Sequence, residues 1–207
     1  MYIPKPYEEK DQAEIEALVR EFGFATIVSN KDGLPVATHI PFELEVQADG
    51  SWLLNAHLSK ANPQWKTFET AGEVLVIFMG PHTYVSPSWY NHKNVPTWNY
   101  RAVHVYGTVS LVEGEQVEKS LRTLMARYEN AHANKPLSYE EIPAQMLETD
   151  LRGLVGIQVK VSRIEAVAKL SQNRDKESYQ SVIDHLKQVN AYDAARIAEE
   201  MEKRKKD

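Results

Sequence analysis

The segment from residue 24 to residue 57, FATIVSNKDGLPVATHIPFELEVQADGSWLLNAH, decides the fold class. Residues 24–29 are rich in β-branched and aromatic side chains, and the turn signal Asn-Lys-Asp-Gly follows at 30–33. Residues 34–46 are typical of a returning strand, and residues 51–57 of a third strand after an Asp-Gly turn. A parallel α/β sheet would need a helix after nearly every strand, and these three strands have none between them. The pattern therefore predicts antiparallel pairing.

The rest of the chain adds strands and amphipathic helices to this start. Further strands are predicted at residues 74–79, 102–112 and 154–167. Apolar residues at helical spacing predict helices at 11–22 and 115–131, with two more from residue 176 onward, the second capped by Asp193. Short helices are expected within 62–70 and beginning near Pro143.

At least six strands with helices inserted between them predict a mainly β, α+β fold, an antiparallel barrel with peripheral helices. We expect a barrel domain at residues 1–170, with the inserted helices, and a C-terminal helical extension at 171–207.

The composition narrows the classes of function. The chain has 207 residues and no cysteine, which excludes disulfides, thiolate catalysis and cysteine-based metal sites. Its net charge of -5 argues against a large nucleic-acid footprint. No apolar run reaches the length of a membrane span and the start has no signal pattern, so we expect a cytoplasmic protein without membrane contact.

Residues 78–107, FMGPHTYVSPSWYNHKNVPTWNYRAVHVYG, are unusually aromatic and carry three prolines. Proline fixes the backbone in advance, and Trp and Tyr offer flat faces with a polar edge. Such a segment suits a wall against a planar ligand, and it equally suits the core or a dimer interface. Both interpretations stay open.

Two groups of polar residues raise the question of chemistry. Residues 57–63, HLSKANP, follow a strand and open a helix, so they predict either a phosphate site or a Ser N-cap beside a solvated lysine. Five histidines lie near the aromatic segment without metal-site spacing, which favours separate surface or hydrogen-bonded roles over a metal site. Haem ligation by one of them is an alternative. These histidines are His39, His57, His82, His92 and His104.

No nucleotide-loop, nucleophile-elbow or paired-carboxylate motif occurs, so the sequence offers no catalytic residue and leaves enzyme activity open.

Six segments, in order along nearly the whole chain, resemble the PaiB-type FMN-binding negative transcriptional regulators. They are residues 1–4, 37–41, 57–65, 80–90, 95–100 and 169–173. The resemblance implies an FMN-binding split barrel, a homodimer with two FMN sites at the subunit interface, and repression of protease production and sporulation genes.

The resemblance also implies which residues hold FMN. The strand Thr38, His39 and Ile40 would line the flavin ring. Ser59 and Lys60 would meet the phosphate, with His57 on the same strand. Trp98, Asn99 and Tyr100 would approach from the partner chain.

Other functions remain alternatives. The protein could be an FMN-dependent reductase or oxidase, because FMN itself brings the redox chemistry, or a haem-binding split barrel. Its regulatory contact could be with DNA, through a helix-turn-helix at 176–189 and 194–206, or with a protein partner. The nearly balanced charge of residues 160–207, 11 Lys/Arg against 9 Asp/Glu, favours two packing helices over a helix-turn-helix.

Overall fold

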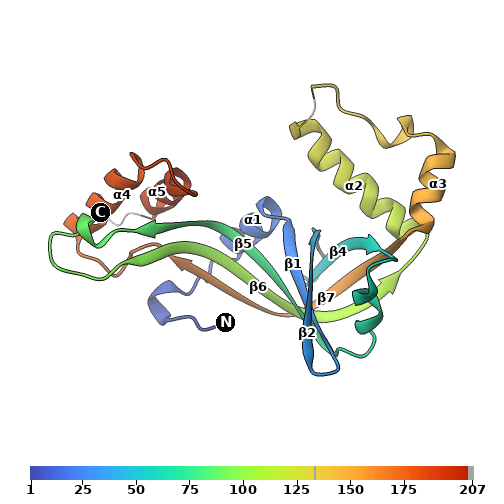
Figure 1. Ribbon diagram of the computed structural model, residues 1–207, viewed down its shortest axis with the longest axis horizontal. Helices are drawn as coiled ribbons and strands as arrows, with labels where there is room; N and C mark the ends of the chain where they lie inside the picture. The colour runs from blue at the N-terminus through green and yellow to red at the C-terminus, as the bar shows by residue number, and fades with distance from the viewer. Residues whose placement is uncertain (133, 205–207) are drawn as a thin grey trace. The chain divides into compact units, whose positions relative to one another are not determined.

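The computed structural model describes residues 1–132 and 134–204 (Figure 1). The described residues form seven strands: β1 Phe24–Lys31, β2 Leu34–Pro41, β3 Glu43–Val46, β4 Trp52–Ser59, β5 Glu73–Val85, β6 Thr97–Val112 and β7 Leu154–Lys169. The α-helices are α1 Gln12–Glu21, α2 Glu115–His132, α3 Ala144–Arg152, α4 Lys176–Leu186 and α5 Ala194–Lys203. Four 3-10 helices are η1 Lys5–Tyr7, η2 Pro63–Thr67, η3 Pro87–Trp89 and η4 Tyr139–Glu141.

The strands form one sheet in the order β2-β1-β5-β6-β7-β4-β3. The β1–β2, β1–β5, β3–β4 and β4–β7 ladders are antiparallel. Within the described chain no ladder joins the end strands β2 and β3, so the sheet stays open. The predicted mainly β architecture, a split antiparallel barrel with peripheral and C-terminal helices, is confirmed.

The strand predicted at 34–46 is in fact two strands, because the chain turns at Phe42. This side chain is only 1% exposed and packs edge-on against Phe78, with ring centroids 6.0 Å apart. The Phe42 amide donates to the Gly23 carbonyl at 2.8 Å, and a Cβ at Gly23 would lie 2.9 Å from the Phe42 carbonyl. Burial of one aromatic ring thus ends β2 and redirects the chain into β3.

The aromatic segment is mostly regular strand. β5 extends through Gly80 and Pro81 to Val85, and β6 begins at Thr97, so only residues 86–96 connect them. Gly80 is required in the strand, because a Cβ there would lie 3.0 Å from both the Arg101 carbonyl and the Leu18 side chain.

The described chain forms two compact units, and β5, β6 and β7 contribute to both. The first comprises Met1–Leu18, Met79–Val103 and Glu165–Asp207, of which residues 205–207 lie outside the described part. The second comprises Val19–Phe78 and His104–Ile164, and residue 133 within it also lies outside that part.

The core of the first unit joins the C-terminal helices to the strand ends. Fully buried side chains of α4 and α5 pack against residues of β5 and of the end of β7. This cluster includes Val85, Ala168, Leu170, Val182, Ile183, Leu186, Ile197, Ala198 and Met201. The described residues from 171 to 204 therefore share a hydrophobic core with earlier parts of the chain. No helix among the described residues is both long enough and apolar enough to cross a membrane.

Candidate functional site

In the second unit, β2 places the three predicted ring-lining residues on an end strand of the sheet. Asp32 and Gly33 have φ of 53° and 84°, the two positive values of a tight two-residue hairpin turn. Such a turn makes Lys31 and Leu34 a hydrogen-bonded pair. Non-hydrogen-bonded and hydrogen-bonded pairs then alternate along the ladder. The main-chain groups of Ala37 and His39 therefore point away from β1. The amide and carbonyl groups of these two residues are hydrogen-bond donors and acceptors at the edge of β2 that faces away from β1.

The side chains of these residues lie in three environments. His39 is exposed; its Nδ1 lies 2.8 Å from Thr26 Oγ1, and its ring stacks near Phe24 at 6.4 Å. Thr38 is half-buried, and its hydroxyl accepts a hydrogen bond from the Asn62 amide at 2.9 Å. Ile40 is buried in the core. His39 and the edge main chain are thus the surface that a planar ligand would meet.

The connection after β4 carries the predicted phosphate residues, and its backbone amides are already bonded. The Lys60 amide donates to the Gly153 carbonyl at 2.8 Å, and the Ala61 amide donates to Ser59 Oγ at 3.2 Å. Asn62 caps η2 by accepting from the Gln64 amide at 3.0 Å. Ser59 is therefore not the helix cap. The groups left for an anion are the Ser59 hydroxyl and the Lys60 ammonium.

Lys60 is exposed and forms no ion pair with the residues that the structure describes. It borders a pocket of about 410 Å³ whose lining includes Glu113, Glu115 and Glu118. Glu148 and Arg152 also line it, and the excess of carboxylates over cations weakens the attraction for a phosphate on that side.

His57 faces α2 rather than the free edge. Its Nδ1 lies 3.4 Å from Ser120 Oγ, and burial lowers the pKa of the imidazole. A neutral ring at neutral pH can donate or accept one hydrogen bond there, and it adds no charge to a phosphate site.

Trp98, Asn99 and Tyr100 belong to the first unit, on β6. Trp98 is 41% exposed, and its ring centroid lies 5.2 Å from that of Tyr192 and 6.3 Å from that of His82. The Asn99 amide is fully buried and donates to Ser171 Oγ at 3.0 Å. Tyr100 is half-buried. Asn99 therefore anchors the strand, and Trp98 presents the aromatic surface.

Sequence reasoning missed Asn62 and Phe24. The signal for Asn62 was present, because Asn directly before Pro is the pattern of an N-cap followed by a proline in the first turn. Phe24 had no comparable signal, because its position beside His39 depends on the pairing of β1 with β2.

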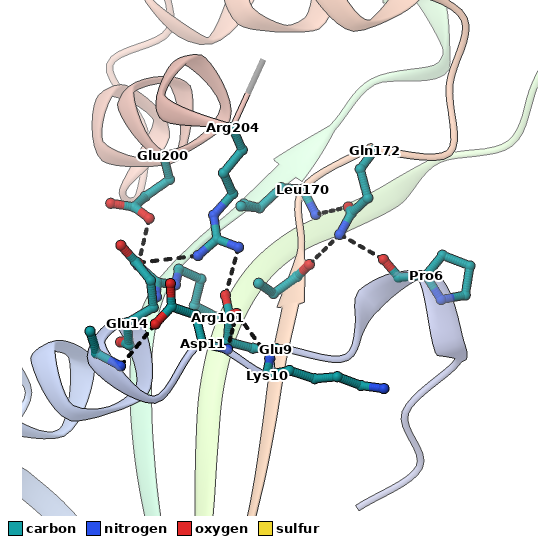
Figure 2. A network of polar contacts seen from close by, with 12 residues as sticks. Pro6, Glu9, Lys10, Asp11, Glu14, Arg101, Leu170, Gln172, Glu200 and Arg204 are labelled. Atoms are coloured by element: carbon teal, nitrogen blue, oxygen red, sulfur yellow. Dashed lines mark hydrogen bonds and ion pairs between the residues drawn. The ribbon is translucent and has the colours of Figure 1, made fainter. Parts of the chain in front are cut away.

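A charged network in the first unit holds α5 (Figure 2). Arg101 binds Glu14 at 2.9 Å and Glu200 at 2.5 Å, and Arg204 binds Glu9 at 2.6 Å and Glu14 at 3.2 Å. The two arginines that lie against α5 are thus neutralised by carboxylates. The basic residues Lys205 and Lys206, part of the DNA-contact alternative, lie outside the described residues.

Residues 1–163 match a family model described as "Putative FMN-binding domain". This chain belongs to that family. Among curated proteins, it is 41% identical over 202 residues to protease synthase and sporulation protein PAI 2 of Bacillus subtilis, covering 98% of this chain and 97% of the relative. It is 27% identical over 223 residues to an uncharacterized protein of Emericella nidulans, covering 88% of this chain and 89% of the relative.

Solved structures share the fold. A conserved hypothetical protein of Mycobacterium tuberculosis superposes with a TM-score of 0.60 at 15% identity, covering 84% of this chain and 94% of that one. A FAD and heme binding protein of Mycobacterium smegmatis gives 0.59 at 16% identity, covering 84% and 79%. The family assignment confirms the resemblance seen in the sequence and the expectation of a flavin cofactor.

Proposed function

We propose that this chain binds FMN through β2 and the connection after β4, and acts as a negative regulator of protease production and sporulation genes. The observation that carries the binding proposal is the hydrogen bond between Thr38 and Asn62. It holds the strand proposed for the ring beside the segment proposed for the phosphate, so that one ligand reaches both.

Each group has a distinct role in this site. The free main-chain groups of Ala37 and His39 bond the polar edge of the ring, and the exposed His39 ring packs against its face. Ser59 and Lys60 bind the phosphate through a hydroxyl and a charge-assisted hydrogen bond. A bound flavin supplies one- and two-electron redox chemistry.

We propose a homodimer in which Trp98, Asn99 and Tyr100 of one subunit complete the site of the other. The support is the exposed aromatic surface of Trp98, with Tyr192 and His82 beside it. Asn99 contributes by fixing the strand that carries Trp98. A partner subunit's indole would cover the ring face that the chain's own residues leave open.

The regulatory role rests on similarity to PAI 2, whose name refers to protease synthase and sporulation. We place the regulatory contact with a protein partner rather than with DNA. The exposed charged residues of α4, its C-cap and α5 mix Lys176, Lys187, Arg196 and Lys203 with Glu177, Asp184, Glu199 and Glu202. A DNA-binding helix would instead carry a basic face.

The deciding experiment is an absorbance spectrum of the purified protein before and after addition of FMN and removal of free ligand. We expect a flavin spectrum that stays with the protein, together with a dimer by light scattering. Absence of retained flavin, with no quenching in a fluorescence titration, would overturn the binding proposal. Turnover of NAD(P)H by the loaded protein would make it a reductase instead.

The regulatory proposal has its own test. The flavin-loaded protein should not shift promoter fragments of its protease and sporulation genes, and deleting its gene should raise their transcription. A specific gel shift that Lys176→Ala and Lys187→Ala abolish together would assign the contact to DNA. Unchanged transcription on deletion would remove the regulatory role.

A further inference from the structure

A row of polar side chains crosses three neighbouring strands of the second unit. The register aligns Glu43 with Asn55 and Asn55 with Gln158. The Asn55 amide donates to Glu45 Oε2 at 3.2 Å, and the Gln158 amide donates to Asn55 Oδ1 at 2.9 Å. A sheet face beneath an amphipathic helix is normally apolar. This row breaks the pattern that folding alone requires, and such breaks mark functional sites.

The helix above the row, α2, contacts the strands at two places. Near its start Val117 packs so closely on β7 that a Cβ at Gly156 would lie 2.7 Å from its side chain. Ten residues further along the helix, Arg127 Nη1 binds Glu43 Oε2 at 3.1 Å. Between these supports lies a groove of about 480 Å³, lined by residues of α2, β3, β4 and β7 together with Arg20 of α1 and Val112 of β6. That volume lies within the range of about 300–1,000 Å³ typical of small-molecule sites.

The strand wall of this groove is acidic. Glu45 accepts hydrogen bonds from Gln47 at 3.0 Å and from Asn55 at 3.2 Å, which leaves part of its acceptor capacity unused. Glu43 lies beside it, where burial raises the pKa of the carboxyl and the Arg127 charge opposes that rise. A ligand ammonium group is the natural donor for this wall.

The helix wall presents a cation. The Lys119 ammonium forms no ion pair or hydrogen bond with the described residues. The nearby hydroxyls are engaged, because Thr123 donates to the Lys119 carbonyl at 2.9 Å and Ser120 Oγ lies 3.4 Å from His57 Nδ1. The half-buried Val112 supplies the apolar side chain of the lining, since the Leu44 and Ile157 side chains belong to the core. A carboxylate at Lys119 and an apolar group against Val112 complete the complementarity.

We propose that this groove binds a free α-amino acid with an apolar side chain. Its ammonium group lies at Glu45 and Asn55, and its carboxylate lies at Lys119. A ligand with one sign of charge would satisfy one wall and leave the other unmatched. None of the nine residues proposed for FMN lines the groove, and only His57 contacts a groove residue, Ser120, so the two sites are separate and adjacent.

Isothermal titration with free L-leucine, L-isoleucine, L-valine and L-methionine, one at a time, tests the proposal. Leucinamide, which lacks the carboxylate, and 4-methylpentanoate, which lacks the amine, are the matched probes. We expect at least one amino acid to bind. Each of the two analogues of leucine should bind at least about tenfold more weakly than leucine itself. No binding of any amino acid, or equal binding of leucine and either analogue, would overturn it.

Two variants locate the site. Glu45→Gln should weaken amino-acid binding by about tenfold or more by removing the ammonium partner, and Lys119→Ala should do the same through the carboxylate. Lys66→Ala, on η2, is the matched control and should bind as the unaltered protein does. If Glu45→Gln fails to fold by circular dichroism, Lys119→Ala at its exposed helix position carries the test alone. Binding unaffected by Lys119→Ala would overturn the assignment.

FMN titrations of the same samples separate this proposal from the flavin proposal. Both variants should bind FMN as the unaltered protein does. A protein that binds amino acids and not FMN would contradict only the flavin site, and the reverse would contradict only the groove.

Discussion

The Asn62 side-chain amide donates a hydrogen bond to the Thr38 hydroxyl at 2.9 Å. This pair joins the end strand β2 to the connection after β4, two segments that no backbone ladder joins in the described chain. Because both segments carry residues proposed for FMN, the pair connects the geometry of the ring site to that of the phosphate site.

Replacing Thr38 by valine should therefore affect both stability and ligand affinity. The variant keeps the shape of the side chain and removes the acceptor, which leaves the Asn62 amide without this partner at a half-buried site. We expect a loss of about 1 kcal/mol in the free energy of unfolding and weaker FMN binding. Urea unfolding and flavin fluorescence measure the two effects. Thr38→Ser, which keeps the hydroxyl, should retain affinity; if Thr38→Val also retains it, the pair has no role in the site.

Lys60→Ala should weaken FMN binding without affecting the fold. The change removes one charge-assisted hydrogen bond, worth about 1.5–3 kcal/mol, or roughly one to two orders of magnitude in Kd. Lys66→Ala, a nearby lysine over the Trp65 ring, is the control and should bind normally. Equal affinities of the two variants would remove Lys60 from the site.

The acid sensitivity of the first unit should depend on Glu200. Burial raises the pKa of this carboxyl, and the nearby cations Lys203, Arg101 and Arg204 more than offset it and hold the pKa below its ordinary value. A depressed folded-state pKa stabilises the protein above the unfolded-state value, and this contribution is lost as the pH falls through the folded-state pKa. Thermal unfolding of Glu200→Gln should depend less on pH below about pH 5 than that of the unaltered protein.

The same pH series supplies the control. Glu177→Gln, at an exposed position on α4, should leave the acid slope unchanged. Identical slopes for Glu200→Gln and the unaltered protein would show that the arginine network contributes nothing to acid stability.

Deletion of residues 176–207 should disrupt the first unit. It removes the buried side chains of α4 and α5 and exposes Val85 and Leu170 beneath them. Each large buried side chain contributes about 1.5–3 kcal/mol, so the loss exceeds what a marginally stable unit tolerates. We expect poor solubility and loss of protected amides in residues 79–103 by hydrogen exchange. A soluble fragment with unchanged protection there would show that the C-terminal helices are an independent extension.

Local sequence patterns predicted most elements of this fold. The amphipathic spacing of α1 and α2 and the turn residues of the β1–β2 hairpin depend on neighbours along the chain, and they appear where expected. The break at Phe42 was missed because it depends on Phe78, which is distant in sequence. Asp193 precedes α5 as predicted, but its carboxylate accepts from the His82 amide at 3.2 Å and makes no cap hydrogen bond to the helix.

The candidate sites show the same limit. Ser59 and Lys60 were predicted from their place between a strand and a helix, and Thr38 through a family resemblance. The link between the two segments depends on Asn62, which the motif contains but does not explain. The row of Glu45, Asn55 and Gln158 could not be anticipated, because each residue is unremarkable in its own strand. Only the registers of β3 with β4 and of β4 with β7 bring them together.

Gly156 lets Val117 and Val112 approach β7 more closely than any side chain would allow. It does not line the groove, yet it fixes the height of α2 above the strands. The width of the groove thus depends on the absence of a side chain at Gly156, where α2 contacts β7. A substitution at Gly156 would change which ligands fit the groove while every residue that binds them stays the same. Relatives could therefore differ in selectivity through a residue that does not itself contact the ligand.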